Sequence, residues 1–182
     1  MDRRSVPPLM TIDAASPRQD PNSRIAALRT PLRPWLGGAL LWGAAMAVSA
    51  WLGFALLQNI PVTHDDELMS LYFGGGAFAW LVALPLVRFL SRDRPAETRF
   101  AAALLMLGAG TIAMTAFLFA MQYRLFYAQW HAPFGSRIWM FQFVFTSAGA
   151  VYQFAVLGIR PLLPLGGPVL VLTSLLLARR SR

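Results

Sequence analysis

Four long apolar stretches dominate the chain. They cover residues 35–57, 68–90, 100–121 and 138–159, and none of them contains Asp, Glu, Lys or His. Arg88 is the only charged residue within them. Because an α-helix rises about 1.5 Å per residue and the hydrocarbon core of a bilayer is about 30 Å thick, each stretch is long enough to span a membrane as a helix. The pattern predicts an all-α, polytopic transmembrane helix bundle.

A fifth apolar segment, residues 162–178, is shorter than the other four and has two prolines and two glycines in its first half. A segment of this length is at the lower limit for a span. We favour a short fifth span, because re-entrant backbone must be shielded by protein and this bundle is small. The alternative is a half-helix from about Pro168 that dips into the membrane and returns. A fifth span would put the three C-terminal arginines outside, whereas a half-helix would keep them inside.

The first 34 residues have a different composition, with six prolines, six arginines and no apolar core that would suit a signal peptide. We therefore expect residues 1–34 to be a disordered tail ahead of a transmembrane domain at 35–182. Within the tail, a short helix with Ile25, Leu28 and Leu32 on one face is an alternative to a plain positive topology signal.

The distribution of arginine predicts the orientation in the membrane. The tail has six arginines and the second connector has four, whereas the third connector has only Arg124 and Arg137 and the loop at residues 60–67 has none. Since positive loops stay inside, the N-terminus should be cytoplasmic and the 60–67 loop should lie outside. The absence of lysine and the abundance of Ala, Leu and Gly favour a bacterial protein. We expect a multi-pass protein of the bacterial inner (plasma) membrane.

Composition excludes several classes of function. Apolar residues make up 57% of the chain and the mean hydropathy is +0.52, both above the values of soluble domains. The net charge of +8 lies beside the helix ends rather than in a stripe with aromatics, which argues against nucleic-acid binding. No cysteine is present, so disulfides and thiol chemistry are excluded.

The spans also lack the groups that most membrane chemistry needs. None contains a carboxylate, which disfavours an ion-coupled transporter. The two histidines, His64 and His131, fall in loops, where they cannot ligate a haem between helices. No serine in the spans has a histidine or lysine at membrane depth to act as a base, which disfavours catalysis. We expect no enzyme activity, no cofactor and no metal.

Small residues mark faces where helices can pack closely. Gly74, Gly75 and Gly76 stand together in the second span, and three glycines in a row indicate either a very close helix crossing or a flexible point. Gly43 in the first span and Gly110 in the third lie on faces of small residues that allow close backbone approach. Close packing is the simpler interpretation, and a hinge is the alternative.

One polar stripe runs along the fourth span. Gln142, Thr146, Gly149 and Gln153 follow one another at steps of four, three and four residues, which places them on one helix face. Because an amide in hydrocarbon needs a partner, this face should point into the bundle or into another subunit. We favour contact between helices; the alternative is a polar track for a small solute or a lipid headgroup.

The predicted outer side holds charges of both signs. We expect pairing between acidic and basic residues there, worth at most about 1 kcal/mol per pair. A zinc site built from His64, His131 and a carboxylate is a weaker alternative, since the spacing matches no metal motif. The residues expected to pair are Asp65, Asp66, Glu67, Arg124 and Arg137.

These features favour a non-catalytic accessory, scaffold or assembly subunit that packs against other integral membrane proteins and membrane lipids. The first alternative is a passive carrier or channel for a small or lipid-like solute, built around Gln142, Thr146 and Gln153 with residues 74–76 as a gate. The second alternative is a quinone-site or electron-transfer subunit, suggested only by the aromatic content. The identity of a partner and the oligomeric state stay open.

Overall fold

The computed structural model describes residues 32–58 and 65–180, and within these ranges every regular element is a helix. The all-α prediction is confirmed, while the predictions for the tail and for His64 lie outside the described residues. Five helices are long and apolar enough to cross a membrane. They are α2 (Leu32–Gly53), α3 (Asp65–Ser91), α4 (Ala96–Tyr127), α5 (Arg137–Gln153) and α6 (Leu163–Arg180). Short π-helical or 3-10 segments extend them: η1 (Phe54–Gln58), η2 (Ala128–Trp130), η3 (Phe154–Gly158) and η4 (Arg160–Leu162).

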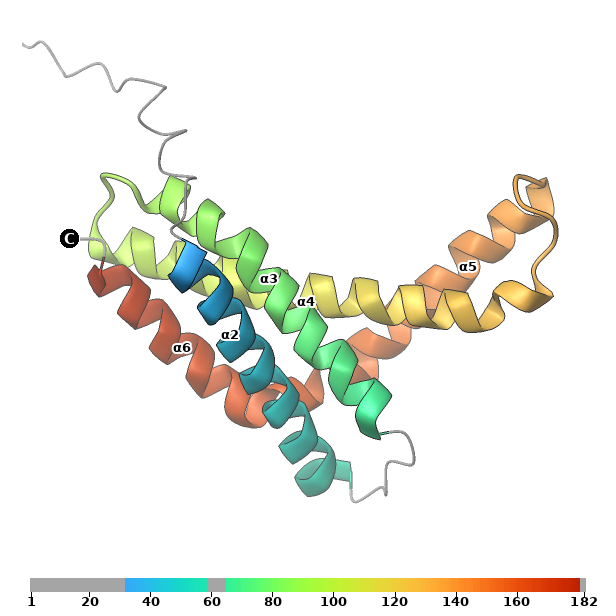
Figure 1. Cartoon of the computed structure of the whole chain (residues 1–182), viewed down its shortest axis with the longest axis horizontal. Helices are drawn as coiled ribbons and strands as arrows, with labels where there is room; N and C mark the ends of the chain where they lie inside the picture. Colours follow the sequence, from blue (N-terminus) through green and yellow to red (C-terminus); the bar gives the residue numbers. More distant parts are fainter. Residues whose placement is uncertain (1–31, 59–64, 181–182) are drawn as a thin grey trace, which may run out of the picture.

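Four of the helices, α2, α3, the first half of α4, and α6, lie together in a bundle (Figure 1). Near the start of α2, the Trp35 indole N–H donates a 2.9 Å hydrogen bond to the Leu81 carbonyl in the second half of α3. In the second half of α2, Ser49 contacts Leu162 just before α6 begins. Both α3 and α6 therefore run antiparallel to α2.

This arrangement gathers arginines at one end of the bundle. The start of α2, the end of α3, the start of α4 and the end of α6 lie on the same side (Figure 1). We call this side the arginine end, because it holds the arginines in or next to those four helix termini: Arg33, Arg88, Arg92, Arg94, Arg99 and Arg179.

Helix α5 lies beside the second half of α4, outside the bundle (Figure 1). Both α5 and α6 run antiparallel to α4: the Phe154 ring, just after α5, lies 5.2 Å from that of Phe119, and a Cβ on Gly108 would lie 3.1 Å from Leu170 of α6. The chain bends between them at η4. Because α5 and α6 point the same way along α4, the C-terminal end returns to the arginine end.

That return revises one expectation drawn from the sequence. Residues 163–178 do form one helix rather than a dipping half-helix, but the helix does not place its end, at Arg179, opposite the start of α2. The expectation assumed that each apolar stretch reverses the chain relative to the one before. Here α5 and α6 share a direction, so that assumption fails at their junction.

The second half of α4 and α5 form an extension that we call the hairpin, residues 118–153. With 32 residues, α4 is about 48 Å long, well beyond the thickness of a hydrocarbon core. At the tip, Gly135 has a φ of +84°, which favours glycine, and Ser136 caps α5 by accepting a 3.1 Å hydrogen bond from the Trp139 N–H. The sequence therefore encodes a defined turn between the two helices.

Candidate functional site

The backbone at the junction between α5 and α6 departs from a regular α-helix. Pro161 and Pro164 have no N–H, so the normal helical hydrogen bonds cannot all form there. The Leu162 N–H bonds to Ile159 instead of Gly158, which leaves the Gly158 carbonyl without its usual helical partner. The hydroxyl of Tyr72, from α3, donates a 2.8 Å hydrogen bond to that carbonyl.

Ser49 of α2 inserts into the first turn of α6. Its hydroxyl oxygen accepts hydrogen bonds from the backbone N–H groups of Leu165 at 3.2 Å and Gly166 at 2.8 Å. The same hydroxyl lies 2.9 Å from the Leu162 carbonyl oxygen and 3.3 Å from that of Pro161. Backbone that leaves the helical pattern is tolerated in hydrocarbon only when protein groups satisfy it, and Ser49 supplies such groups at this break.

Close approach of α2 makes that contact possible. Gly53 lies one turn after Ser49, and a Cβ there would come within 2.6 Å of the Pro161 carbonyl oxygen. Any larger residue would push the junction away from α2. Gly53 and Ser49 together hold the junction against the bundle.

Beside the junction lies a cavity of about 350 Å³, which we call the junction cavity. Its wall is mainly aromatic and aliphatic, with rings of Phe54, Phe119 and Phe154. Three polar side chains lie in the wall: Tyr72, Tyr123 and Gln153. The Tyr72 hydroxyl already donates its hydrogen bond to the Gly158 carbonyl.

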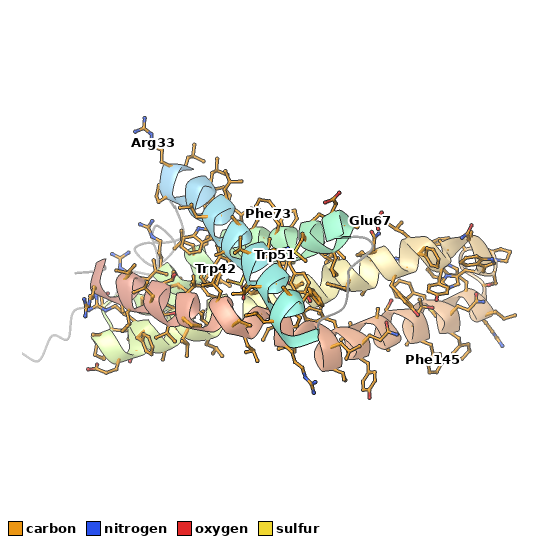
Figure 2. The ribbon with its side chains drawn as sticks, turned by 90° about the horizontal axis from the view of Figure 1, so that it is seen from below. Arg33, Trp42, Trp51, Glu67, Phe73 and Phe145 are labelled. Atoms are coloured by element: carbon orange, nitrogen blue, oxygen red, sulfur yellow. The ribbon has the colours of Figure 1, made fainter. Side chains whose placement is uncertain are left out.

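A second opening, of about 490 Å³, lies between α2 and α6 near the arginine end. We call it the α2–α6 groove. Its wall is apolar over most of its length, and Trp42 and Trp80, whose ring centroids are 6.0 Å apart, lie at its base. Arg33 is at the edge, on the first turn of α2, with its side chain directed away from the helices (Figure 2). The groove therefore combines an apolar wall with a cation at one end.

The predicted polar stripe divides into two parts. Gln142 accepts a 2.8 Å hydrogen bond from the Ala132 N–H, and the Thr146 hydroxyl lies 3.4 Å from His131 Nε2. These contacts join α5 to the turn before it. Gln142 and Thr146 thus bind within the hairpin, not to the interior of the bundle.

The other half of the stripe is open. Gly149 is exposed, and a Cβ on it would meet no atom within 4 Å. Gln153 is exposed as well and lines the junction cavity. The structure brings only Gln153 to a cavity.

The glycines of α3 lie where helices cross. A Cβ on Gly75 would come within 2.8 Å of the Thr115 Cα in α4, and one on Gly76 would lie 3.1 Å from the Gly43 Cα in α2. Gly43 in turn approaches the Phe73 carbonyl oxygen, at 2.7 Å from a Cβ built there. A Cβ on Gly74 would lie 3.1 Å from Leu118 of α4. Gly43, Gly75 and Gly76 therefore lie close to the backbone of a neighbouring helix, whereas Gly74 lies close to a leucine side chain.

Gly110 behaves differently, because a Cβ there would meet only Ala79 at an ordinary 3.8 Å. The buried face of α4 lies one position further along the helix and includes Ala103, Leu107, Thr111 and Thr115. This face repeats every four residues. The four-residue spacing is present in the sequence. The prediction rested instead on the small residues around Gly110, which lie on the neighbouring face.

Arg124 contacts aromatic rings. Its guanidinium carbon lies 4.3 Å from the ring centroid of Phe143 and 5.7 Å from that of Trp139, which is cation–π geometry. Among the described side chains, no ion pair joins Arg124 or Arg137 to Asp66 or Glu67. The side chain of Asp65 lies outside the described residues, as does His64. One ion pair in the described part of the chain links Arg92 to the adjacent Asp93 at 3.7 Å.

Several residues that shape these sites were not singled out from the sequence. Tyr72 is fully buried, and Trp42 donates a 3.0 Å hydrogen bond to the Thr111 hydroxyl across the bundle. The Thr115 hydroxyl donates to the Thr111 carbonyl at 2.7 Å. Hydroxyls spaced by four residues within an apolar span were the available signal, because such groups need partners in hydrocarbon.

Comparison of the chain with protein-family models, with curated proteins and with solved structures finds no match in any of the three. Fold and composition therefore define the class by themselves. Five apolar helices of spanning length, with arginines concentrated at one end of the bundle, are the structure of a multi-pass helical membrane protein.

Proposed function

We propose that the protein is a non-catalytic subunit that packs against another integral membrane protein through α5. The observation behind this proposal is the exposure of that helix: Ala150 is the one buried residue of α5. Phe145 is 71% exposed and Tyr152 is 70% exposed, and Phe145 projects away from the rest of the chain (Figure 2). Exposed apolar surface of this kind is covered in a membrane by lipid or by another protein.

The shape of this face favours a helix as the partner. Gly149 and the neighbouring Ala148 are both exposed, and they lie between the large side chains of Phe145 and Tyr152. Small residues flanked by bulky ones allow the backbone of another transmembrane helix to approach closely. Because a Cβ on Gly149 would meet no atom of the described residues within 4 Å, the space beside it is open to such a helix.

We propose that the protein lies in the bacterial inner membrane with its N-terminus in the cytoplasm. Arginine without lysine supports a bacterial origin, and the positive-inside tendency supports a cytoplasmic arginine end.

The test is a substitution that fills the open space. Gly149→Trp should block a partner helix without disturbing this chain, so co-purification in mild detergent should fall several-fold relative to wild type. Gly37→Trp is the matched control, since Gly37 also lies in a helix with no atom within 4 Å of a Cβ, but far from α5.

A photo-crosslinker at position 145 identifies what lies against α5. We expect an adduct with a different integral membrane protein, and we expect Gly149→Trp to remove it. An adduct at twice the chain mass of 20.1 kDa would show self-association instead. A wild-type chain that crosslinks only to lipid and elutes alone would contradict the proposal.

A second candidate, a passive carrier for a lipid-like solute, is supported by the junction cavity. Gln153 offers an exposed amide at the wall of that cavity, but Gln142 and Thr146 are engaged in the hairpin turn. If this function holds, flux through liposomes should fall several-fold in Gln153→Leu and stay unchanged in Gln129→Leu, which alters an exposed amide at the hairpin tip. Flux that is the same in all three proteins, or absent in wild type, would remove this candidate.

A further inference from the structure

The α2–α6 groove has a shape and lining that suit a single acyl chain. Val169, Thr173 and Leu176 of α6 face Leu41 and Trp42 of α2 across about 490 Å³. The groove follows the two helices, which lie within the apolar part of the bundle. An aliphatic chain is the ligand that fits such a wall, because its methylenes gain dispersion contacts there and bring no polar group that needs a partner.

One end of the groove carries positive charge. Arg33 is exposed at the edge of the groove, on the first turn of α2. The described carboxylates at the arginine end are Asp93, which pairs with Arg92, and Glu97 in the first turn of α4. The arginines at the same end outnumber these two carboxylates: Arg33, Arg88, Arg92, Arg94, Arg99 and Arg179. The charge at this end therefore complements an anion.

The ring of Trp80 lies along the groove. Trp80 lines it and is 91% buried, and its indole N–H has no hydrogen-bond partner in the part of the chain that the structure describes. Trp80 packs against Gly38, which is five residues, or about 7.5 Å, along α2 from Arg33. The indole nitrogen is itself buried against Gly38, so Trp80 offers the groove a ring face and not a hydrogen-bond donor.

We propose that the α2–α6 groove binds an acyl chain of an anionic phospholipid whose phosphate pairs with Arg33. The cation at one end and the apolar wall beyond it lie in the same order as the phosphate and the acyl chain of such a lipid. A partner helix would fill the apolar wall but would supply no anion at Arg33. This site lies at the opposite side of the bundle from α5, so it is independent of the docking proposed above.

The experiment uses purified full-length protein and native mass spectrometry, with phosphatidylglycerol as the anionic probe and phosphatidylcholine as the neutral one. Wild type should retain phosphatidylglycerol in preference. Gly37 lines the groove, and a Cβ on it would meet no atom within 4 Å, so Gly37→Trp fills the groove with little strain on the helices. This variant should lose retention of both lipids. Gly149→Trp, which adds the same side chain at an open helical glycine of α5, should retain both as wild type does.

Arg33→Gln tests the charge separately from the chain. It should keep acyl-chain binding but reduce the preference for phosphatidylglycerol about fivefold, the effect of losing one exposed ion pair. Arg137→Gln, which removes an exposed arginine at the start of α5, is the control and should keep the preference. Inorganic phosphate added in excess should not displace the lipid if the acyl chain supplies most of the binding.

Two results would overturn the proposal. One is equal retention of both lipids by wild type, which would show that Arg33 does not select an anion. The other is unchanged retention in Gly37→Trp while circular dichroism shows native helix content, which would show that the lipid binds elsewhere.

Discussion

At the scale of single residues, Ser49 has the largest structural role that the sequence did not reveal. A serine in an apolar span usually bonds back to its own helix, and nothing in its neighbours indicates otherwise. Its actual partners, from Pro161 to Gly166, are more than a hundred residues away. Only the folded chain shows that this hydroxyl completes the start of another helix.

Ser49→Ala should therefore destabilise the bundle. The N–H groups of Leu165 and Gly166 would lose a buried acceptor, and a net loss of about 1 kcal/mol is expected, because part of the helical pattern can reform with the Pro161 and Leu162 carbonyls. Thermal unfolding in detergent measures the change. Ser70→Ala is the control, since Ser70 also donates to a carbonyl, that of Glu67 at 2.6 Å, but is exposed. Equal melting of the two variants would show that the Ser49 contacts add nothing.

For the glycines at residues 74–76, the sequence predicts two possible roles. Three consecutive glycines pointed to close packing or a hinge, and both require the absence of a side chain. The structure supplies their neighbours: Thr115 on one side and Gly43 on the other. Such neighbours depend on which helices cross at that level, and the sequence of one helix does not contain that information.

At the scale of elements, the sequence predicts where each helix lies but does not always predict where it ends. The third apolar stretch ends at residue 121, yet α4 continues through Gln122 and Arg124 to Tyr127. Hydropathy reports where a chain prefers lipid, whereas a helix ends where its hydrogen bonds end, and polar residues do not break them. The continuation makes the hairpin, where Arg124 lies over Trp139 and Phe143.

In the sequence, prolines are the only indication of the break between α5 and α6. Pro161 and Pro164 indicate an interruption, since each lacks a backbone donor. They do not fix the direction in which the chain continues. Tyr72 and Ser49, from α3 and α2, bind the interrupted backbone and set that direction.

At the scale of the whole molecule, the fold places both termini of the described chain at the arginine end (Figure 1). If α2, α3, α4 and α6 are the helices that cross the membrane, the number of crossings is even and α5 lies to one side. Arg179, in the last turn of α6, then lies on the same side as the arginines of the other connectors, in agreement with the positive-inside tendency.

This arrangement predicts the labelling of single cysteines. The chain has no native cysteine, so Ser5→Cys and Ser181→Cys can be probed in intact spheroplasts with a membrane-impermeant maleimide. Both should stay unlabelled until the cells are opened, whereas Ser136→Cys at the hairpin tip should label at once. Labelling of Ser181→Cys from the side opposite to Ser5→Cys would mean an odd number of crossings, with α5 as a full span.

The sequence by itself determined that the chain forms apolar helices, about where each lies, and that arginine is concentrated at one set of ends. These properties are local, since apolar length and charge act on each segment separately. Only the tertiary structure decided that α5 leaves the bundle and that α6 returns the chain to its starting side. The contacts responsible, such as Ser49 with Leu162 and Gly53 with Pro161, join residues far apart in the chain. Their pairing depends on the shape of every helix between them, which no single segment specifies.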